Sequence, residues 1–207
     1  MRTVTAEHYF SADPSAPSRP REVVFEVAGR EYRLATASGV FSADRLDPGT
    51  AVLLRKAPLP GPDSTGNLLD LGCGYGPVAA VLASRAPRAT VYAVDVNTRA
   101  LELVRRNAVT LGVADRVVSV TPDEVLASTR FAQIWSNPPI RVGKEELHGL
   151  LARWLPRLVP GGEAWLVVAR HLGADSLQSW LTAQGWPAVR HASQKGYRVL
   201  RVTAENR

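Results

Sequence analysis

LLDLGCGYGP, at residues 68–77, joins an apolar run to a series of alternating glycines and a proline. The apolar run predicts a buried strand, and the proline predicts the first turn of a helix directly after the glycines. In open α/β sheets, ligands bind where a strand ends in this way. Glycines there let the backbone approach a ligand, and the helix N-terminus favours a carboxylate. The stretch therefore predicts an α/β fold with a ligand site at residues 72–76.

The spacing of the glycines narrows the class of ligand. Gly72, Gly74 and Gly76 alternate, and Asp70 lies two residues before the first of them. A dinucleotide-binding loop needs its third glycine one position later, where this chain has Pro77. NAD binding is therefore disfavoured.

Strand and helix patterns alternate from Asn67 to the end of the chain, which is typical of a parallel sheet with helices on both faces. Only SQKG, residues 193–196, lies between the last two strand patterns, so these form a hairpin and one strand is antiparallel. The predicted fold class is α/β: a Rossmann-like, seven-stranded, mostly parallel sheet with helices on both faces and an antiparallel last strand, preceded by an N-terminal β-hairpin. The predicted strands are 67–72, 90–96, 116–121, 131–137, 163–170, 188–193 and 197–202, and the predicted helices are 77–86, 97–112, 144–158 and 175–185.

The N-terminal part of the chain has a different pattern. Residues 11–20, SADPSAPSRP, predict an irregular arm. Alternating segments at 22–27 and 31–36 predict the β-hairpin, and the segment 39–58 ends in a short apolar helix or strand. The expected organisation is an arm at 1–20 and a single domain at 21–207, made of a hairpin and connector at 21–60 and a cofactor-binding and catalytic core at 61–207.

Composition favours a folded cytoplasmic protein. Hydrophobic residues make up 45% of the chain, but apolar runs such as 164–169 are too short to cross a bilayer. The N-terminus, MRTVTAEHYF, has no apolar signal core, so we expect neither export nor a membrane partner. The single cysteine, Cys73, excludes an intramolecular disulfide and fits a reducing compartment. Its place among glycines favours a small packing residue over a nucleophile.

The net charge of +6 is unevenly distributed. Residues 1–60 hold 8 Lys/Arg against 7 Asp/Glu, residues 61–140 hold 7 against 7, and residues 141–207 hold 10 against 5. A one-sided basic excess is what a polyanion-binding face would show. A soluble protein from an arginine-rich proteome would show it too, so charge alone leaves both interpretations open.

Asp95 ends the strand pattern TVYAVD, 19 residues after Gly76. An acidic side chain at this distance from a glycine loop can accept hydrogen bonds from both hydroxyls of a ribose. The alternative is an aspartate that caps the following helix. Because position, spacing and residue type agree, the sequence favours a nucleoside-containing cofactor.

The segment Asn137-Pro138-Pro139-Ile140 begins at the last residue of the strand pattern 131–137. It indicates chemistry at an amine. A conjugated amine is a poor nucleophile because its lone pair is delocalised. Two acceptors directed at its N–H protons, the Asn137 side-chain oxygen and the Pro138 carbonyl, would hold the amine in a nucleophilic geometry. Successive prolines would fix the backbone that carries them. The alternative is an ordinary loop after a strand.

DLGCGYG, AVDVN and SNPPI together resemble a class I S-adenosylmethionine-dependent methyltransferase. The resemblance implies S-adenosylmethionine as cofactor, with the glycines around its methionine part, Asp95 on the ribose and Asp123 near the adenine. Thr50, with Phe41, Asp47 and Gly49, falls where relatives line the methionine end, although a packed connector is the alternative. The implied cofactor-binding set is Asp70, Gly72, Cys73, Gly74, Gly76, Asp95, Val96, Asp123, Asn137 and Thr50, and the implied catalytic set is Asn137, Pro138, Pro139 and Ile140.

The resemblance extends to the small-domain methyltransferases, through residues 8–11, 38–54, 137–151 and 195–202 as well as the hairpin. This family includes enzymes that make N2-methylguanine in small-subunit ribosomal RNA, and the chain is most similar to its single-domain members. Many relatives carry Phe or Tyr where this chain has an isoleucine in the catalytic motif, and isoleucine cannot stack on a target ring. The implied substrate-binding residues are Arg141, Lys144, Tyr197 and Arg198.

Three functions follow as expectations. The first is methylation of a nucleobase exocyclic amine, guanine N2 in 16S ribosomal RNA, with RNA as the partner. The second is methylation of a protein glutamine or a small molecule, against which the basic bias argues mildly. The third is a non-catalytic, cofactor-binding RNA-associated protein, against which the intact Asp70, Asp95 and Asn137 argue. No metal is expected, because the histidines show no metal-ligand spacing.

Overall fold

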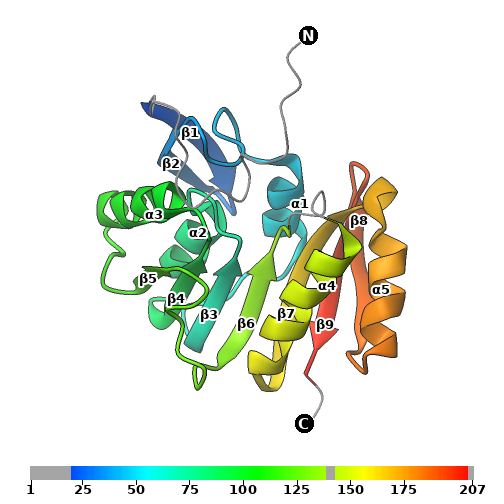
Figure 1. Ribbon diagram of the computed structural model, residues 1–207. Helices are drawn as coiled ribbons and strands as arrows, with labels where there is room; N and C mark the ends of the chain where they lie inside the picture. The colour runs from blue at the N-terminus through cyan, green and yellow to red at the C-terminus, as the bar shows by residue number, and fades with distance from the viewer. Residues whose placement is uncertain (1–19, 139–142, 205–207) are drawn as a thin grey trace.

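A computed structural model of the protein describes residues 20–138 and 143–204 (Figure 1). Of the arm expected at 1–20, all but Pro20 lies outside the described residues. The strands are β1 (Pro20–Val27), β2 (Arg30–Ala37), β3 (Thr65–Leu71), β4 (Arg88–Val94), β5 (Val117–Val120), β6 (Phe131–Ser136), β7 (Leu158–Ala169), β8 (Ala188–Gln194) and β9 (Tyr197–Thr203). The α-helices are α1 (Pro48–Lys56), α2 (Pro77–Arg85), α3 (Thr98–Thr110), α4 (Lys144–Trp154) and α5 (Ala174–Ala183), with short 3-10 segments at Leu155–Arg157 and Arg170–Leu172.

Seven strands form the central sheet in the order β5-β4-β3-β6-β7-β9-β8. The strands from β5 to β7 pair in parallel, and β9 is antiparallel to both of its neighbours. The predicted α/β class, the seven-stranded, mostly parallel sheet and its antiparallel last strand are confirmed. Because parallel strands end at one edge, β3, β4 and β6 deliver the residues that follow them to the same side of the molecule.

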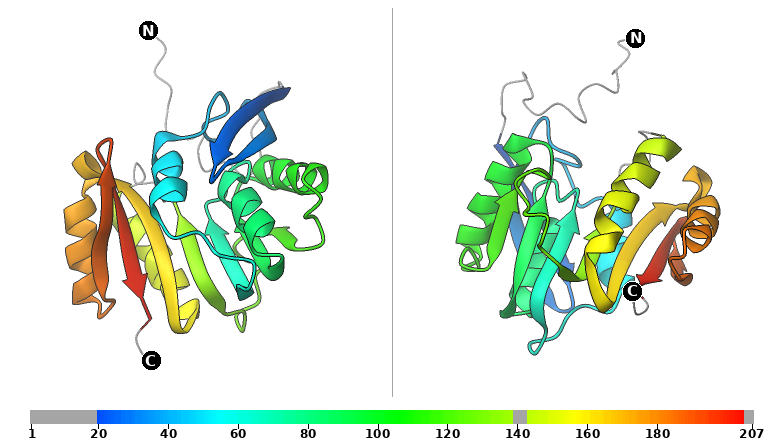
Figure 2. Two further views of the ribbon diagram at one scale, coloured as in Figure 1. Left: turned by 180° about the vertical axis from the view of Figure 1, so that it is seen from behind. Right: turned by 60° about the horizontal axis from the view of Figure 1, so that its bottom comes forward.

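Helices cover both faces of the sheet (Figure 2). Trp135 and Trp165 point into a core shared with α1, α2 and α3, whereas Ile134 and Leu166 point into a core shared with α4 and α5. This alternation along β6 and β7 is the period of two that a strand imposes. Both cores hold nearly fully buried side chains, so the sheet is a rigid platform for whatever its carboxyl edge carries. Within the described residues, no helix is both long and apolar enough to span a bilayer.

The predicted hairpin is present as a separate two-stranded sheet, β1–β2. It is held to α3 by Asn107, whose side chain accepts from Ala35 N at 2.7 Å and donates to Ala35 O at 2.9 Å. The same Asn107 amide donates to the carbonyl of Tyr75 at 3.0 Å. Because Asn107 is buried, its three hydrogen bonds connect the hairpin firmly to the glycine-rich turn. The hairpin is thereby fixed over α3, on the side of the sheet where its parallel strands end (Figure 1).

The segment around residue 158 differs from expectation. The helix predicted over 144–158 ends at Trp154, and β7 begins at Leu158, before Pro160-Gly161-Gly162 rather than after it. Residues between Leu158 and Glu163 bulge out of the ladder with β6, while Gly161 and Gly162 exchange backbone hydrogen bonds with Ala204. Gly162 fits there because an added Cβ would lie 2.9 Å from the carbonyl oxygen of Val159. Contacts with a distant part of the chain therefore place this proline- and glycine-rich segment inside a strand, at a bulge.

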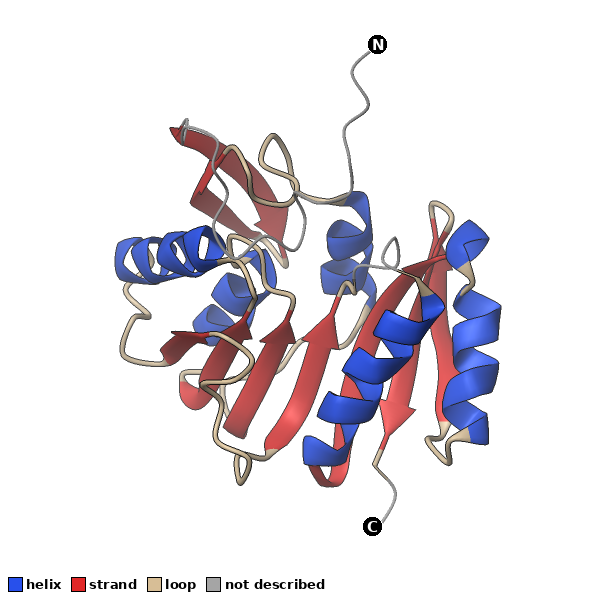
Figure 3. Cartoon of the chain, in the orientation of Figure 1, coloured by secondary structure: helices blue, strands red, loops and turns tan. Residues whose placement is uncertain are grey.

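The connection between β5 and β6, residues 121–130, contains no helix (Figure 3). The segment 39–58, expected to end in a helix or a strand, ends in the helix α1. Asp47 caps this helix by accepting a hydrogen bond from Thr50 N at 2.9 Å. The cap fixes the Asp47 carboxylate within hydrogen-bond distance of the Asn137 side chain, which follows β6.

Candidate active site

The glycine-rich turn joins β3 to α2 and is tied to the neighbouring strand. Gly72 N and Cys73 N both donate to the carbonyl of Val94, at 2.9 and 3.1 Å. Gly72 and Gly74 have φ of +74° and +54°, a region that side chains rarely allow. A Cβ added at either position would meet no atom within 4 Å. The turn therefore presents open backbone, and its two glycines leave room for a ligand to approach closely.

Gly76 has a different role. It is the N-cap of α2 with φ of +87°, and an added Cβ would lie 2.9 Å from Cγ2 of Val104. Val104 is buried on α3 and, being β-branched, has little freedom to turn away. The absence of a side chain at Gly76 thus lets α2 and α3 pack together beneath the turn.

Gly76→Ala is expected to lower the free energy of unfolding by roughly 2–4 kcal/mol, from backbone strain plus overpacking. The matched control is Gly29→Ala in the hairpin, where φ is +77° and no atom lies within 4 Å of the added Cβ. That variant should show the strain alone, about 1–2 kcal/mol. Urea unfolding of both variants measures the difference, and equal losses would contradict the packing role of Gly76.

Two buried or nearly buried carboxylates lie beneath and beside the turn. Asp70 accepts from Ala79 N at 2.9 Å, at the start of α2. Asp95, directly after β4, accepts from Gly74 N at 2.8 Å and from Asn97 N at 2.9 Å. Asp95 therefore shapes the glycine turn directly, and Asn97 in turn caps α3.

Burial changes the acid–base behaviour of these groups. The pKa of Asp70 is raised to about 7: desolvation by burial is the largest cause, the hydrogen bond from Ala79 N–H opposes it, and the nearby charge of Asp95 adds to it. Desolvation also raises the pKa of Asp95, and the hydrogen bonds that its carboxylate accepts from backbone N–H groups partly offset this rise. Burial raises the pKa of the Cys73 thiol well above its usual value, which suits the packing role predicted for it. Two desolvated acids side by side favour a cationic ligand.

Asn137 reaches the same edge from β6. Leu71 of β3 pairs with Ser136, so the residues that follow them, Gly72 and Asn137, emerge side by side. The Asn137 side-chain amide nitrogen donates to Asp47 Oδ1 at 2.7 Å and to Thr50 Oγ1 at 3.0 Å. Both protons of this amide therefore have acceptors on α1 or at its cap.

These elements enclose one cavity at the carboxyl edge of the sheet. It brings together six of the residues expected to bind the cofactor, from segments that are far apart in the sequence. The lining consists of Phe41, Ser42, Asp47, Thr50, Asp70, Gly72, Cys73, Gly74, Tyr75, Pro77, Val78 and Asn137. The segment before α1 is thus a wall of the cavity and not only a packed connector.

Tyr75 lines the cavity but was not among the residues expected to bind the cofactor. Its side chain is 2% exposed, and among the described residues its hydroxyl has no hydrogen-bond partner. Burial raises the pKa of this phenol, and the charge of Asp47 raises it further, so the hydroxyl stays a donor. Because buried polar groups are normally paired, this hydroxyl is a candidate donor to a bound ligand. The sequence signal for Tyr75 is the position of its polar side chain inside the glycine motif, between Gly74 and Gly76.

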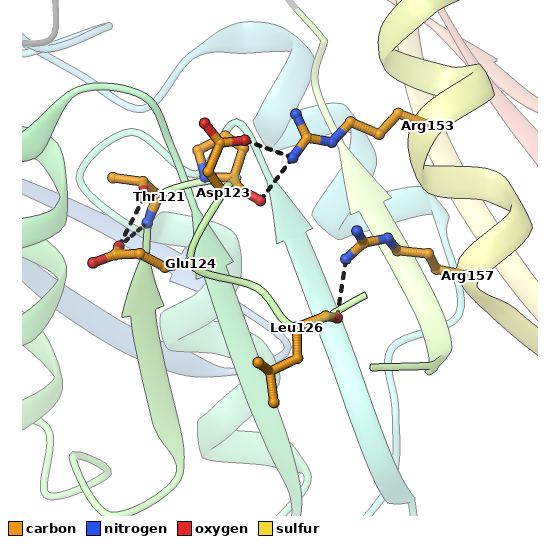
Figure 4. Close-up of polar contacts among 7 residues, drawn as sticks. Thr121, Asp123, Glu124, Leu126, Arg153 and Arg157 are labelled. Atoms are coloured by element: carbon orange, nitrogen blue, oxygen red, sulfur yellow. Dashed lines mark hydrogen bonds and ion pairs between the residues drawn. The ribbon is translucent and has the colours of Figure 1, made fainter. Parts of the chain in front are cut away.

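Asp123, expected near the adenine, lies on the loop after β5 and does not line the cavity. Its side chain is 90% exposed and forms an ion pair of 2.8 Å with Arg153 of α4, which also donates to Pro122 O (Figure 4). In the same loop, Thr121 donates from N and Oγ1 to Glu124, and Arg157 reaches the carbonyl of Leu126 (Figure 4). The adenine role of Asp123 stays a prediction.

The remaining expected residues lie around the site or outside the described chain. Val96 follows Asp95 and is 39% exposed. Lys144 is an exposed residue in the first turn of α4. Tyr197 packs against Gly49 of α1, and Arg198 pairs with Asp175. Pro138 is buried, whereas Pro139, Ile140 and Arg141 lie outside the described residues. Over residues 20–138 and 143–204, no cluster of potential metal ligands occurs.

Fold and site together define a class I S-adenosylmethionine-dependent methyltransferase: a seven-stranded sheet with one antiparallel strand, a glycine turn after β3, an acid after β4 and Asn-Pro after β6. The family model of the methyltransferase small domain matches residues 31–201. The chain belongs to this family, and its cofactor is S-adenosylmethionine.

Relatives and solved structures agree with this assignment. The chain is 35% identical over 173 residues to the uncharacterized protein YbxB of Bacillus subtilis, covering 83% of this chain and 85% of the relative. It is 34% identical over 178 residues to ribosomal RNA small subunit methyltransferase C of Pseudomonas aeruginosa, covering 78% of this chain and 52% of the relative. The chain thus spans about half the length of that relative.

A similar solved structure is the 16S rRNA N2 G1207 methyltransferase (RsmC) of T. thermophilus, in complex with AdoMet and guanosine. The TM-score is 0.77 at 25% identity, over 93% of this chain and 52% of that chain. The residues present here fit the same cofactor. The open backbone at Gly72 and Gly74, the desolvated acids and the unpartnered Tyr75 hydroxyl suit a cationic ligand with polar groups.

Proposed function

We propose that this protein transfers a methyl group from S-adenosylmethionine to an exocyclic amine of a nucleobase in RNA, with guanine N2 of 16S ribosomal RNA as the first candidate. The observation that carries the proposal is the position of Asn137, which lines the same cavity as the glycine turn and has both amide protons bound to α1 and its cap. An acceptor oxygen is left for the substrate.

Different residues of the chain would bind different parts of the cofactor. Backbone groups of Gly72 and Gly74, the Tyr75 hydroxyl and the Asp70 carboxylate would hold its methionine part, and Asp95 its ribose. When bound, the cofactor supplies an electrophilic methyl group. Phe41 and Thr50, which also line the cavity, would limit the access of water.

Asn137 and Pro138 would then prepare the nucleophile. The Asn137 Oδ1 and the Pro138 carbonyl accept the two N–H protons of the amine, so its lone pair faces the methyl group. The nitrogen gains a bond to carbon as the methyl group leaves sulfur, and the excess proton passes to water afterwards. This requires no strong base. The acids of the site serve its structure instead: Asp70 and Asp95 accept backbone N–H groups around the glycine turn, and Asp47 accepts from Asn137.

RNA is favoured as the substrate by charge and by the relatives. The last third of the chain carries 10 Lys/Arg against 5 Asp/Glu, and phosphate contacts would make binding salt-sensitive. Relatives named as ribosomal RNA methyltransferases match most of the chain. A base amine must leave its stack to reach Asn137, so a loop or a partly assembled particle is the expected substrate, encountered in the cytoplasm. Lys144 and Arg141 are the first candidates for phosphate contacts.

The test offers the purified protein isotope-labelled S-adenosylmethionine together with unmodified small ribosomal subunits, naked ribosomal RNA, transfer RNA and a protein extract in parallel. We expect label in small-subunit RNA, falling steeply as salt is raised. Label in protein alone would support a protein-glutamine methyltransferase instead. Cofactor binding without transfer to any macromolecule or small molecule would favour the non-catalytic alternative.

A further inference from the structure

Asp47 connects two parts of the molecule that are remote in the sequence. Its Oδ1 accepts from Thr50 N at 2.9 Å, which caps α1, and from Asn137 Nδ2 at 2.7 Å, across a sequence separation of 90 residues. Thr50, in the first turn of the capped helix, accepts the second Asn137 proton through Oγ1 at 3.0 Å. The cap of α1 and the orientation of Asn137 are therefore one hydrogen-bonded unit.

A carboxylate partner determines which way an asparagine amide points. Ionised aspartate only accepts hydrogen bonds, so the Asn137 –NH2 group must face it and the Oδ1 oxygen must face away. With a partner that can both donate and accept, the two orientations of the amide would compete. Asp47 thus excludes the flipped amide, in which an N–H donor would be offered to the substrate and an amine would be repelled.

The surroundings leave the carboxylate little room to move. A Cβ added to Gly49 would lie 3.0 Å from Asp47 Oδ1 and 3.0 Å from Cε1 of Tyr197. Thr50 is 5% exposed, and α1 packs on β7 and β9. The acceptors of Asn137 are therefore fixed by the core, which is what a site needs to hold its geometry without reorganisation.

From this arrangement we infer that Asp47 is a positioning residue for methyl transfer: it orients the Asn137 amide so that its carbonyl oxygen, and not its –NH2 group, faces the substrate amine. The inference rests on the proposed function. It adds a requirement on the substrate, which must present N–H donors at the reacting atom, so an amine is accepted and a carbonyl oxygen is rejected. The same hydrogen bonds polarise the Asn137 carbonyl and make it a stronger acceptor.

Two substitutions separate the positioning role from the capping role. In Asp47→Asn the N–H of Thr50 still orients the introduced side chain, so its Oδ1 remains the acceptor that faces Asn137 and the two amide orientations do not compete. Asp47→Ser caps a helix as well as aspartate does but is one atom too short to hold Asn137. We expect Asp47→Ser to lower kcat by about 10- to 100-fold, with the KM for S-adenosylmethionine within about threefold of wild type. Asp47→Asn should retain most of kcat. Both variants should unfold at similar temperatures.

A second readout does not depend on activity. In the protein without cofactor, the side-chain amide protons of Asn137, identified by their loss in Asn137→Ala, should exchange slowly with water in wild type and Asp47→Asn and quickly in Asp47→Ser. If Asp47→Ser fails to fold, Thr50→Val removes only the second acceptor and should lower kcat several-fold. Wild-type kcat together with slow exchange in a folded Asp47→Ser would overturn the inference. If wild type methylates no RNA while the exchange pattern holds, the proposed function fails and the orienting role of Asp47 stands.

Discussion

Replacing Asn137 with alanine is expected to lower methyl transfer by roughly 100- to 1,000-fold, because it removes an acceptor that acts on the amine in the transition state. Cofactor affinity should stay within a few-fold of wild type, since the expected cofactor contacts of Asp70, Gly72 and Gly74 would remain. Single-turnover rates with saturating RNA, combined with calorimetric titration of S-adenosylmethionine, separate the two effects.

The control is Asn67→Ala, which alters an asparagine of β3 that bonds the carbonyl of Arg130 far from the cavity. It should transfer methyl groups at the wild-type rate. Turnover retained in Asn137→Ala would rule out the Asn-Pro-Pro chemistry altogether. An equally large loss of cofactor affinity would instead assign Asn137 to binding.

Replacing Asp70 with asparagine is expected to change how stability depends on pH. The pKa of Asp70 is about 7 in the folded protein and 3.8 in the reference state. Below pH 3.8 the carboxyl is protonated in both the folded and the unfolded state, and its ionisation does not affect stability. As the pH rises towards 7, the carboxyl ionises in the unfolded state but not in the folded state. The folded state is therefore destabilised by a growing amount, up to about 4 kcal/mol. The introduced amide cannot ionise, so the free energy of unfolding of the variant, relative to wild type, should rise by about 2–4 kcal/mol between pH 4.5 and 8.

Urea unfolding without cofactor at several pH values measures this difference. Asp63→Asn, at a carboxylate that is 95% exposed, controls for the general effect of removing a negative charge. Parallel stability curves for wild type and Asp70→Asn would contradict the raised pKa. In wild type a cationic cofactor should also bind more tightly from pH 6 to pH 8, as Asp70 ionises, and this trend should be absent from the variant.

Much of the fold could be predicted because each local pattern agrees with the final structure. The alternation of strands and helices after Asn67 defines the sheet, and the short link at 193–196 defines its antiparallel strand. The exception is β7, where Pro160-Gly161-Gly162 has the composition of a helix stop yet lies inside a strand. Its backbone pairs with Ala204, and such long-range pairing leaves no mark on local sequence.

For the candidate site, too, one part could be predicted from the sequence and another could not. The glycine turn, Asp95 and Asn137 follow three strands of a parallel sheet, so their meeting at one edge could be expected from order alone. The hydrogen bond from Asn137 to Asp47 spans 90 residues, and the packing of Tyr197 on Gly49 spans an even longer stretch of chain. Neither contact corresponds to a periodic pattern in the sequence. Asp123 follows β5 as expected, but Arg153 of α4 holds its side chain at the surface, and that contact depends on how α4 packs.

The most direct measurement identifies the methylated nucleoside. Small ribosomal subunits lacking the modification would be incubated with the protein and S-adenosylmethionine carrying a deuterated methyl group, then digested to nucleosides and analysed by mass spectrometry against synthetic standards. We expect deuterated N2-methylguanosine, absent when Asn137→Ala replaces the wild-type protein. Label on an exocyclic amine of another base would change the substrate but keep the chemistry. Label on a ring nitrogen without an N–H pair, or on a ribose hydroxyl, would rule out methyl transfer to an exocyclic amine held by Asn137.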